Sequence, residues 1–199
     1  MLRSYLAAML VVLLPSLSGA QTISSETCER LGSLRLRNTT VTTAELISGG
    51  TFVPPDGTGT PNPNLSNLPS FCRVVATLKP VAGSDIKMEV WLPAAKWNGK
   101  FMAIGNGGIA GFITYTYRSE GGLAGALKRG YATASTDTGH IGDTAAPFLG
   151  NRVKLEDFAF RAVHEMTVTA KAIIDSVYRV PPKLSFWNGC SLGGRQGLV

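Results

Sequence analysis

The sequence has 199 residues but only two histidines, three cysteines and no run of basic residues. Its formal charge is +6, yet the 19 Lys and Arg residues are scattered and form no stripe interleaved with aromatic residues. A nucleic-acid-binding protein concentrates its positive charge on one face, so we expect no nucleic-acid partner. Hydrophobic residues make up 44% of the chain, which is enough to build a core.

An apolar run long enough for a confident membrane span is also lacking. The apolar stretch Tyr5–Leu17 follows Arg3 and precedes the small residues Ser18–Ala20. This pattern predicts a secretory signal peptide over residues 1–20, with an uncleaved anchor as the alternative. We therefore expect a secreted or periplasmic protein that has no stable membrane anchor after cleavage.

The odd number of cysteines leaves one without a partner inside the chain. Disulfides persist in the oxidising compartments that exported proteins reach. Cys28 and Cys72 both lie in the N-terminal region that would follow the signal peptide, and a bond between them would staple that region. Cys190 is then left over.

Residues 21–70 read as a polar extension that ends in a loop rich in Pro and Gly, and residues 71–199 read as the main domain. In that domain, period-two and apolar runs predict strands at 71–80, 86–92, 100–104, 131–137 and 183–188, and helical spacing predicts helices at 123–129 and 157–178. The first two strands would form an antiparallel hairpin. The later alternation predicts an α/β domain with a mixed, mainly parallel sheet and flanking helices.

The stretch Gly189-Cys190-Ser191-Leu192-Gly193 has the form of a nucleophile elbow. In such an elbow a strand ends in a tight turn that exposes a serine hydroxyl, and a helix follows. The preceding strand pattern supplies the first part of this context. The alternative is a glycine-rich turn with an incidental serine.

An ester hydrolase also needs N–H groups to hold the oxyanion. One donor is usually the amide after the nucleophile, here Leu192, and the second comes from a loop after an earlier strand. The glycine-rich stretch 105–108 fits that place, with Gly108 as the candidate and Gly107 close behind. The same stretch loosely matches a dinucleotide-binding fingerprint, but no helical pattern follows it and no strand ending in an acid comes about twenty residues later.

The two histidines, His140 and His164, both precede Ser191. Hydrolases with this elbow place the acid and the histidine after the serine. We expect His164 to be a packing or surface residue of its helix, and His140 to organise a loop together with Asp137. The general base and the acid are then expected outside this sequence.

Several segments, taken in order, resemble the tannase and feruloyl esterase family over Cys28–Val199: "WNGKF", "GNGG", "STDTGH", "FAFRAVHEMTVTAKAII" and "GCSLGGRQGL". The resemblance implies an α/β-hydrolase fold with a lid domain inserted after the elbow, and Ser191 as the acylated nucleophile. It also implies a structural disulfide between Cys28 and Cys72, and a second one from Cys190 to a cysteine beside the catalytic histidine. The implied substrates are esters of aromatic acids such as gallate or ferulate.

By the same resemblance, no cofactor belongs to this part of the chain, and a calcium ion, where the family has one, lies in the lid. The sequence lacks the lid, the acid, the histidine and the partner of Cys190. We therefore expect it to be the N-terminal part of a longer protein, inactive and prone to aggregate by itself. The alternatives are a non-catalytic secreted module that binds a ligand, and a lipase or acyltransferase of another branch.

Overall fold

The computed structural model describes residues 22–55, 62–116 and 121–199. The expected signal peptide, residues 1–20, and the centre of the Pro- and Gly-rich loop lie outside these ranges. In chain order the elements are α1 (Ser25–Glu29), η1 (Arg30–Ser33), β1 (Thr39–Ile47), η2 (Pro63–Leu65), β2 (Phe71–Leu78), β3 (Ile86–Pro93), β4 (Lys100–Ile104), α2 (Gly122–Lys128), β5 (Ala132–Thr136), η3 (Ala146–Phe148), α3 (Arg152–Glu156), the π-helical turn η4 (Asp157–Arg161), α4 (Ala162–Tyr178), β6 (Leu184–Asn188) and α5 (Leu192–Gln196).

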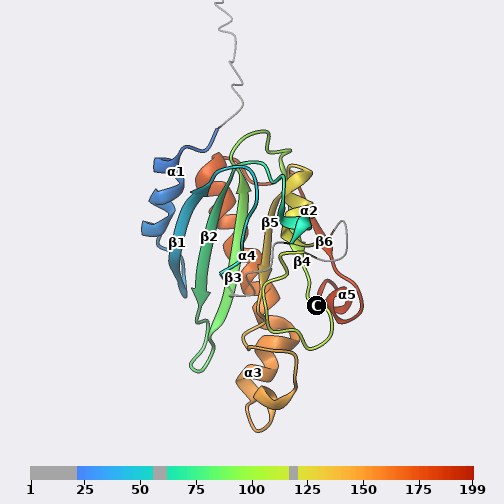
Figure 1. Ribbon diagram of the computed structural model, residues 1–199. Coiled ribbons are helices and arrows are strands. Elements are labelled where there is room, and N and C mark those ends of the chain that lie inside the picture. The colour runs from blue at the N-terminus through green and yellow to red at the C-terminus, as the bar shows by residue number, and fades with distance from the viewer. Residues whose placement is uncertain (1–21, 56–61, 117–120) are drawn as a thin grey trace, which may run out of the picture.

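The strands form one six-stranded sheet in the order β1-β2-β3-β5-β4-β6 (Figure 1). The sheet is mixed, as expected, and the predicted hairpin of β2 and β3 is confirmed. The expected predominance of parallel pairing is wrong, because three pairings of described strands are antiparallel and two are parallel. The reason is that β1, β2 and β3 form an antiparallel meander and β3 then pairs antiparallel with β5.

Strand β1 lies in the segment that the sequence pattern marked only as a polar extension. It pairs with β2 along its length and forms an edge of the sheet. Its residues are half-buried or exposed, which is why the strand is rich in threonine and carries no apolar run. The disulfide that the resemblance implied is present, since Cys28 of α1 is bonded to Cys72 of β2.

Two apolar layers cover the two faces of the sheet. On one face α1 and α4 pack over the strands, and on the other α2 packs together with the segment that precedes β2 (Figure 1). The buried residues of α4 include Met166, Ala170, Ile173 and Ile174, which recur at helical spacing on one side of the helix. Both faces of the sheet are therefore covered by helices and loops.

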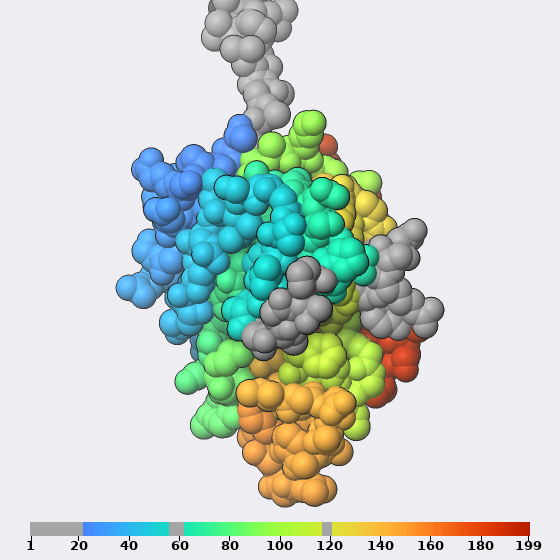
Figure 2. Space-filling model, viewed as in Figure 1, coloured from blue at the N-terminus to red at the C-terminus, as the bar shows by residue number. Residues whose placement is uncertain are grey.

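The long predicted helix begins earlier than expected. Asn151 caps α3 by accepting a hydrogen bond from the Lys154 amide, and η4 joins α3 to α4. Helix α4 ends at Tyr178, and the next residue, Arg179, has a left-handed backbone and precedes Val180 and two prolines. Figure 2 shows η3 and α3 forming the lower end of the visible face. In the described part of the chain, no helix is long and apolar enough to cross a membrane.

Candidate active site

Ser191 occupies a sharp turn between β6, which ends at Asn188, and α5, which begins at Leu192. Its backbone has φ 57° and ψ −127°, a conformation that residues other than glycine rarely adopt. The residue is exposed, so its hydroxyl is accessible at the end of the strand. The predicted order of strand, strained serine turn and helix is therefore confirmed.

Glycines on both sides of the serine allow this turn to close. A Cβ atom at Gly189 would collide with the Gly193 carbonyl, and a Cβ atom at Gly193 would lie 2.5 Å from the Asn106 carbonyl oxygen. The Gly193 carbonyl also accepts a hydrogen bond from Trp187 Nε1 at 2.7 Å. Helix α5 thus packs directly on β6 and on the loop after β4.

That loop, residues 105–111, is called the glycine loop below. Its first residues are tied to the serine turn, since the Asn106 amide donates to Gln196 Oε1 of α5 at 3.0 Å. The Asn106 side chain donates to the carbonyls of Phe112, at 2.7 Å, and Thr136, at 2.9 Å. Asn106 is buried, so these bonds fix the loop against both α5 and β5.

The candidate oxyanion donors lie on the serine turn and on the glycine loop. Among the residues that the structure describes, no acceptor takes a hydrogen bond from the backbone N–H of Leu192, Gly107 or Gly108. Gly107 lines a small hollow together with Cys190 and other residues of the turn. Gly108 is next to it, exposed, with φ +58°. Gly107 therefore lies beside the serine turn. Gly108 is the next residue of the loop and does not line the hollow.

His140 is buried and holds the glycine loop in place. Its Nε2 lies 2.9 Å from the carbonyl oxygen of Ile109, the residue after Gly108, and its Nδ1 lies 3.1 Å from Thr138 Oγ1. Since a carbonyl can only accept, the proton is assigned to Nε2. The ring also packs edge-on against Phe148 and Phe158. Nε2 therefore holds the glycine loop and Nδ1 contacts Thr138 after β5, so His140 organises a loop, as expected from the sequence.

Asp137 holds the start of the loop that carries His140. Its Oδ1 accepts hydrogen bonds from the amides of Lys87, at 2.9 Å, and Gly139, at 2.8 Å. Burial raises the pKa of this carboxyl to about 6, although the two amide bonds act in the opposite direction. His164, in contrast, is exposed on α4, and its imidazole has no hydrogen bond to another described residue.

Cys190 has a free, exposed thiol in the described structure. Its implied disulfide with a cysteine beside the catalytic histidine stays a prediction. No cluster of His, Cys, Asp or Glu among residues 22–55, 62–116 and 121–199 is arranged to hold a metal ion.

Comparison with known proteins identifies the family. The family model described as "Tannase and feruloyl esterase" matches residues 72–199, which is more than half of the chain. The chain belongs to the tannase and feruloyl esterase family. The matched range begins at the second cysteine of the disulfide and includes the glycine loop and the serine turn.

The chain is also similar in sequence to longer curated proteins. An uncharacterized esterase of Xanthomonas campestris pv. campestris is 39% identical over 179 residues, which cover 88% of this chain and 29% of the relative. Feruloyl esterase B of Aspergillus niger is 42% identical over 127 residues, covering 64% of this chain and 23% of that protein. The chain thus spans less than a third of the length of these relatives.

Solved structures of tannase and feruloyl esterase family members give the same picture. The crystal structure of feruloyl esterase B from Aspergillus oryzae matches with a TM-score of 0.75 and 31% identity, over 87% of this chain and 33% of that one. Tannin acyl hydrolase from Aspergillus niger matches with a TM-score of 0.60 at 22% identity, covering 88% of this chain and 33% of that one, and this likeness shows the fold alone. The six-stranded mixed sheet is therefore part of an α/β-hydrolase type of fold.

Proposed function

We propose that Ser191 is the nucleophile of a carboxylic ester hydrolase that acts on esters of aromatic acids, such as feruloyl or galloyl esters. The observation that carries this proposal is the strained, exposed Ser191 turn packed against a glycine loop with free amides. The names of the relatives, feruloyl esterases among them, support the class of substrate.

The proposed reaction is an acyl transfer in two steps. A histidine takes the proton of the Ser191 hydroxyl while Oγ attacks the ester carbonyl. The amides of Leu192 and of Gly108 or Gly107 hold the oxyanion that forms on the carbonyl oxygen. The alcohol leaves with the proton, and water then attacks the acyl-enzyme to release the aromatic acid. Loss of one such donor costs about 10²–10³ in turnover.

The general base of this mechanism is neither His140 nor His164. The Ile109 carbonyl engages Nε2 of His140 and the Thr138 hydroxyl engages Nδ1, and His164 is exposed on α4 beside a groove lined by Phe160 and Val168. We therefore infer that the histidine, the acid and the disulfide partner of Cys190 come from outside residues 1–199. Residues 1–199 alone would retain only a residual advantage over water, of about 10³–10⁴ at most.

We also propose that the protein is exported. The support is the signal-peptide pattern of residues 1–20 and the Cys28–Cys72 disulfide, a bond that is rare in reducing compartments. The mechanism routes no step through a metal or a redox cofactor. A calcium ion in a lid domain remains a prediction of the resemblance.

The test uses the complete open reading frame that contains these 199 codons, expressed and exported. Hydrolysis of methyl ferulate and methyl gallate is measured for the wild type, for Ser191→Ala and for the control Ser185→Ala. Ser185 is exposed on β6 and has no hydrogen bond in the described structure beyond those of the strand, so its loss should leave turnover unchanged. Ser191→Ala should lower kcat at least about 10³-fold.

Three outcomes would contradict the proposal. Undiminished turnover by Ser191→Ala would remove Ser191 from the chemistry. Activity on long-chain esters with none on aromatic-acid esters would favour the lipase reading. Binding of phenolic ligands without any turnover by the wild type would favour the non-catalytic module.

A further inference from the structure

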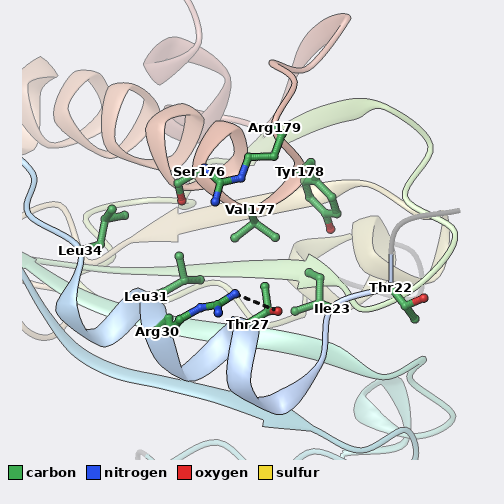
Figure 3. Close-up of a pocket in the computed structure, with 10 residues that line it drawn as sticks. All are labelled: Thr22, Ile23, Thr27, Arg30, Leu31, Leu34, Ser176, Val177, Tyr178 and Arg179. Atoms are coloured by element: carbon green, nitrogen blue, oxygen red, sulfur yellow. Dashed lines mark hydrogen bonds between the residues drawn. The ribbon is translucent and has the colours of Figure 1, made fainter. Parts of the chain in front are cut away.

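A second pocket lies between the N-terminal helices and the end of α4 (Figure 3). Its volume is about 550 Å³, which falls within the range of small-molecule sites. It shares no lining residue with the hollow at the serine turn. This pocket is therefore separate from the candidate active site.

The floor of this pocket is apolar and firmly supported. Ile23 and Leu31 are buried, and Val177 and Leu34 extend the apolar surface. Tyr178 forms one wall, with its hydroxyl donating to the Pro93 carbonyl at 2.7 Å. Its ring stacks on Trp97, with 4.0 Å between the ring centroids. An apolar or aromatic ligand body can thus be buried here without rearranging the core.

Two arginines line the pocket from opposite walls, Arg30 from η1 and Arg179 from the end of α4. In Figure 3 the guanidinium of Arg30 lies beside Thr27 on the side of the N-terminal helices that faces α4, and the side chain of Arg179 runs along the end of α4 toward Ser176. None of the ten residues that line the pocket is an Asp or a Glu. Two positive groups facing one space with no carboxylate between them favour the binding of an anion.

The two arginines have little other use for their charge. Nη1 of Arg30 lies 3.4 Å from Glu26 Oε1 and Nη2 donates to Thr27 Oγ1 at 3.4 Å, but the side chains of Arg30 and Glu26 are well exposed, and such long, exposed contacts contribute little. Arg179 forms no ion pair and no side-chain hydrogen bond with any residue of the described ranges. Its guanidinium is thus free to bind a ligand.

The backbone of Arg179 gives an independent sign. It has φ 57° and ψ 20°, the left-handed conformation in which a helix end usually carries glycine. An arginine pays a conformational penalty there that glycine would avoid. Strain of this kind is frequently retained where the side chain serves binding. At this position the side chain lines the pocket.

We propose that this pocket binds a small organic carboxylate with an aromatic or branched apolar body. The body lies on Leu31 and Val177, and the carboxylate lies between Arg30 and Arg179, which can each donate two parallel hydrogen bonds. A neutral ester lacks the charge, and inorganic phosphate lacks the body. This proposal is independent of the role of Ser191.

The test is isothermal titration calorimetry on the complete exported protein carrying Ser191→Ala, so that the ester probe is not turned over, with three probes: ferulate, methyl ferulate and inorganic phosphate. The binding event of this pocket is the one that substitution of Arg30 or Arg179 weakens. Ferulate should bind at least tenfold more tightly than either of the others. Arg30→Gln and Arg179→Gln should each weaken ferulate binding about tenfold, since each removes a charged hydrogen bond. The control Arg35→Gln changes the same charge at an exposed residue that does not line the pocket, and it should leave the affinity unchanged.

A further variant separates binding from folding. Arg179→Gly relieves the left-handed conformation, so its Tm should be equal to or above that of the wild type while ferulate affinity falls. Equal affinity for ferulate and methyl ferulate would overturn the proposal. So would binding of phosphate as tight as that of ferulate, or unchanged ferulate affinity in both Arg30→Gln and Arg179→Gln.

Discussion

At the scale of single residues, Asp137 couples its proton to folding. Burial raises its pKa to about 6 in the folded protein, whereas the ordinary value for an unfolded aspartate is about 4. As pH rises from 4 to 6, the unfolded chain loses this proton more readily than the folded one. The contribution of Asp137 to the free energy of unfolding is therefore full below pH 4 and lost as pH rises through 6, by up to about 3 kcal/mol.

Asp137→Asn should remove this component, because an amide can still accept the two backbone hydrogen bonds but cannot ionise. The measurement is urea unfolding of wild type and variant at several pH values from 4 to 7. The stability of the variant relative to the wild type should rise over this interval. Asp143→Asn, at an exposed position two residues after Ile141, is the matched control. A constant difference between Asp137→Asn and wild type would contradict the expected coupling.

Some site residues were visible in the sequence and others were not. Ser191 and Leu192 were predicted from a local motif, because the strand, the turn and the start of the helix are all encoded by neighbouring residues. Asn106 and Gln196 are 90 residues apart, and their hydrogen bond depends on how two loops meet. An asparagine between two glycines, as Asn106 is, gives no local indication of a distant hydrogen-bond partner. This contact can be seen only in the folded structure.

At the scale of elements, the two adjacent glycines of α5, Gly193 and Gly194, differ in how much room each has for a side chain. A Cβ atom at Gly193 would lie 2.5 Å from the Asn106 carbonyl oxygen, whereas at Gly194 the nearest atom is 3.5 Å away. Gly193→Ala must push α5 away from the glycine loop and should destabilise the protein by about 1–3 kcal/mol.

Gly194→Ala is the paired variant, and it should stabilise α5 by about 0.5–1 kcal/mol, because alanine is the better helix former. Thermal and urea unfolding of the two variants measure the difference. Equal effects of the two substitutions would contradict the close packing of α5 on the glycine loop.

The elements that were predicted well are those whose apolar pattern is decided locally. The strands β2, β3 and β4 are buried along most of their length, and their apolar residues marked them plainly. β1 was not predicted, since an edge strand buries little and can be made largely of threonine. The number of antiparallel pairings depends on strand order, which no local pattern encodes.

At the scale of the whole molecule, β6 leaves one edge of the sheet open in the described structure. It pairs with β4 on one side only, and its residues Leu184 and Phe186 are 54% and 41% exposed. Open strand edges with apolar side chains pair with other copies. The 199-residue protein should therefore self-associate as its concentration rises.

Phe186→Lys should reduce this association, because a charge on an edge strand opposes pairing with another edge. Size-exclusion chromatography with light scattering over a range of concentrations measures the mass. Ile141→Lys, at a residue that is 87% exposed and away from β6 in the sequence, is the control and should not change it. A monomer at all concentrations in the wild type would contradict the expectation.

The bond between Cys28 and Cys72 spans 44 residues and gives the polypeptide a second covalent route from α1 to the sheet. A peptidase that cuts once between these two cysteines would therefore release nothing. Both pieces would migrate together until a reductant parted them. In an oxidising environment such a cut leaves a nicked but whole molecule, and in a reducing one the same cut removes α1.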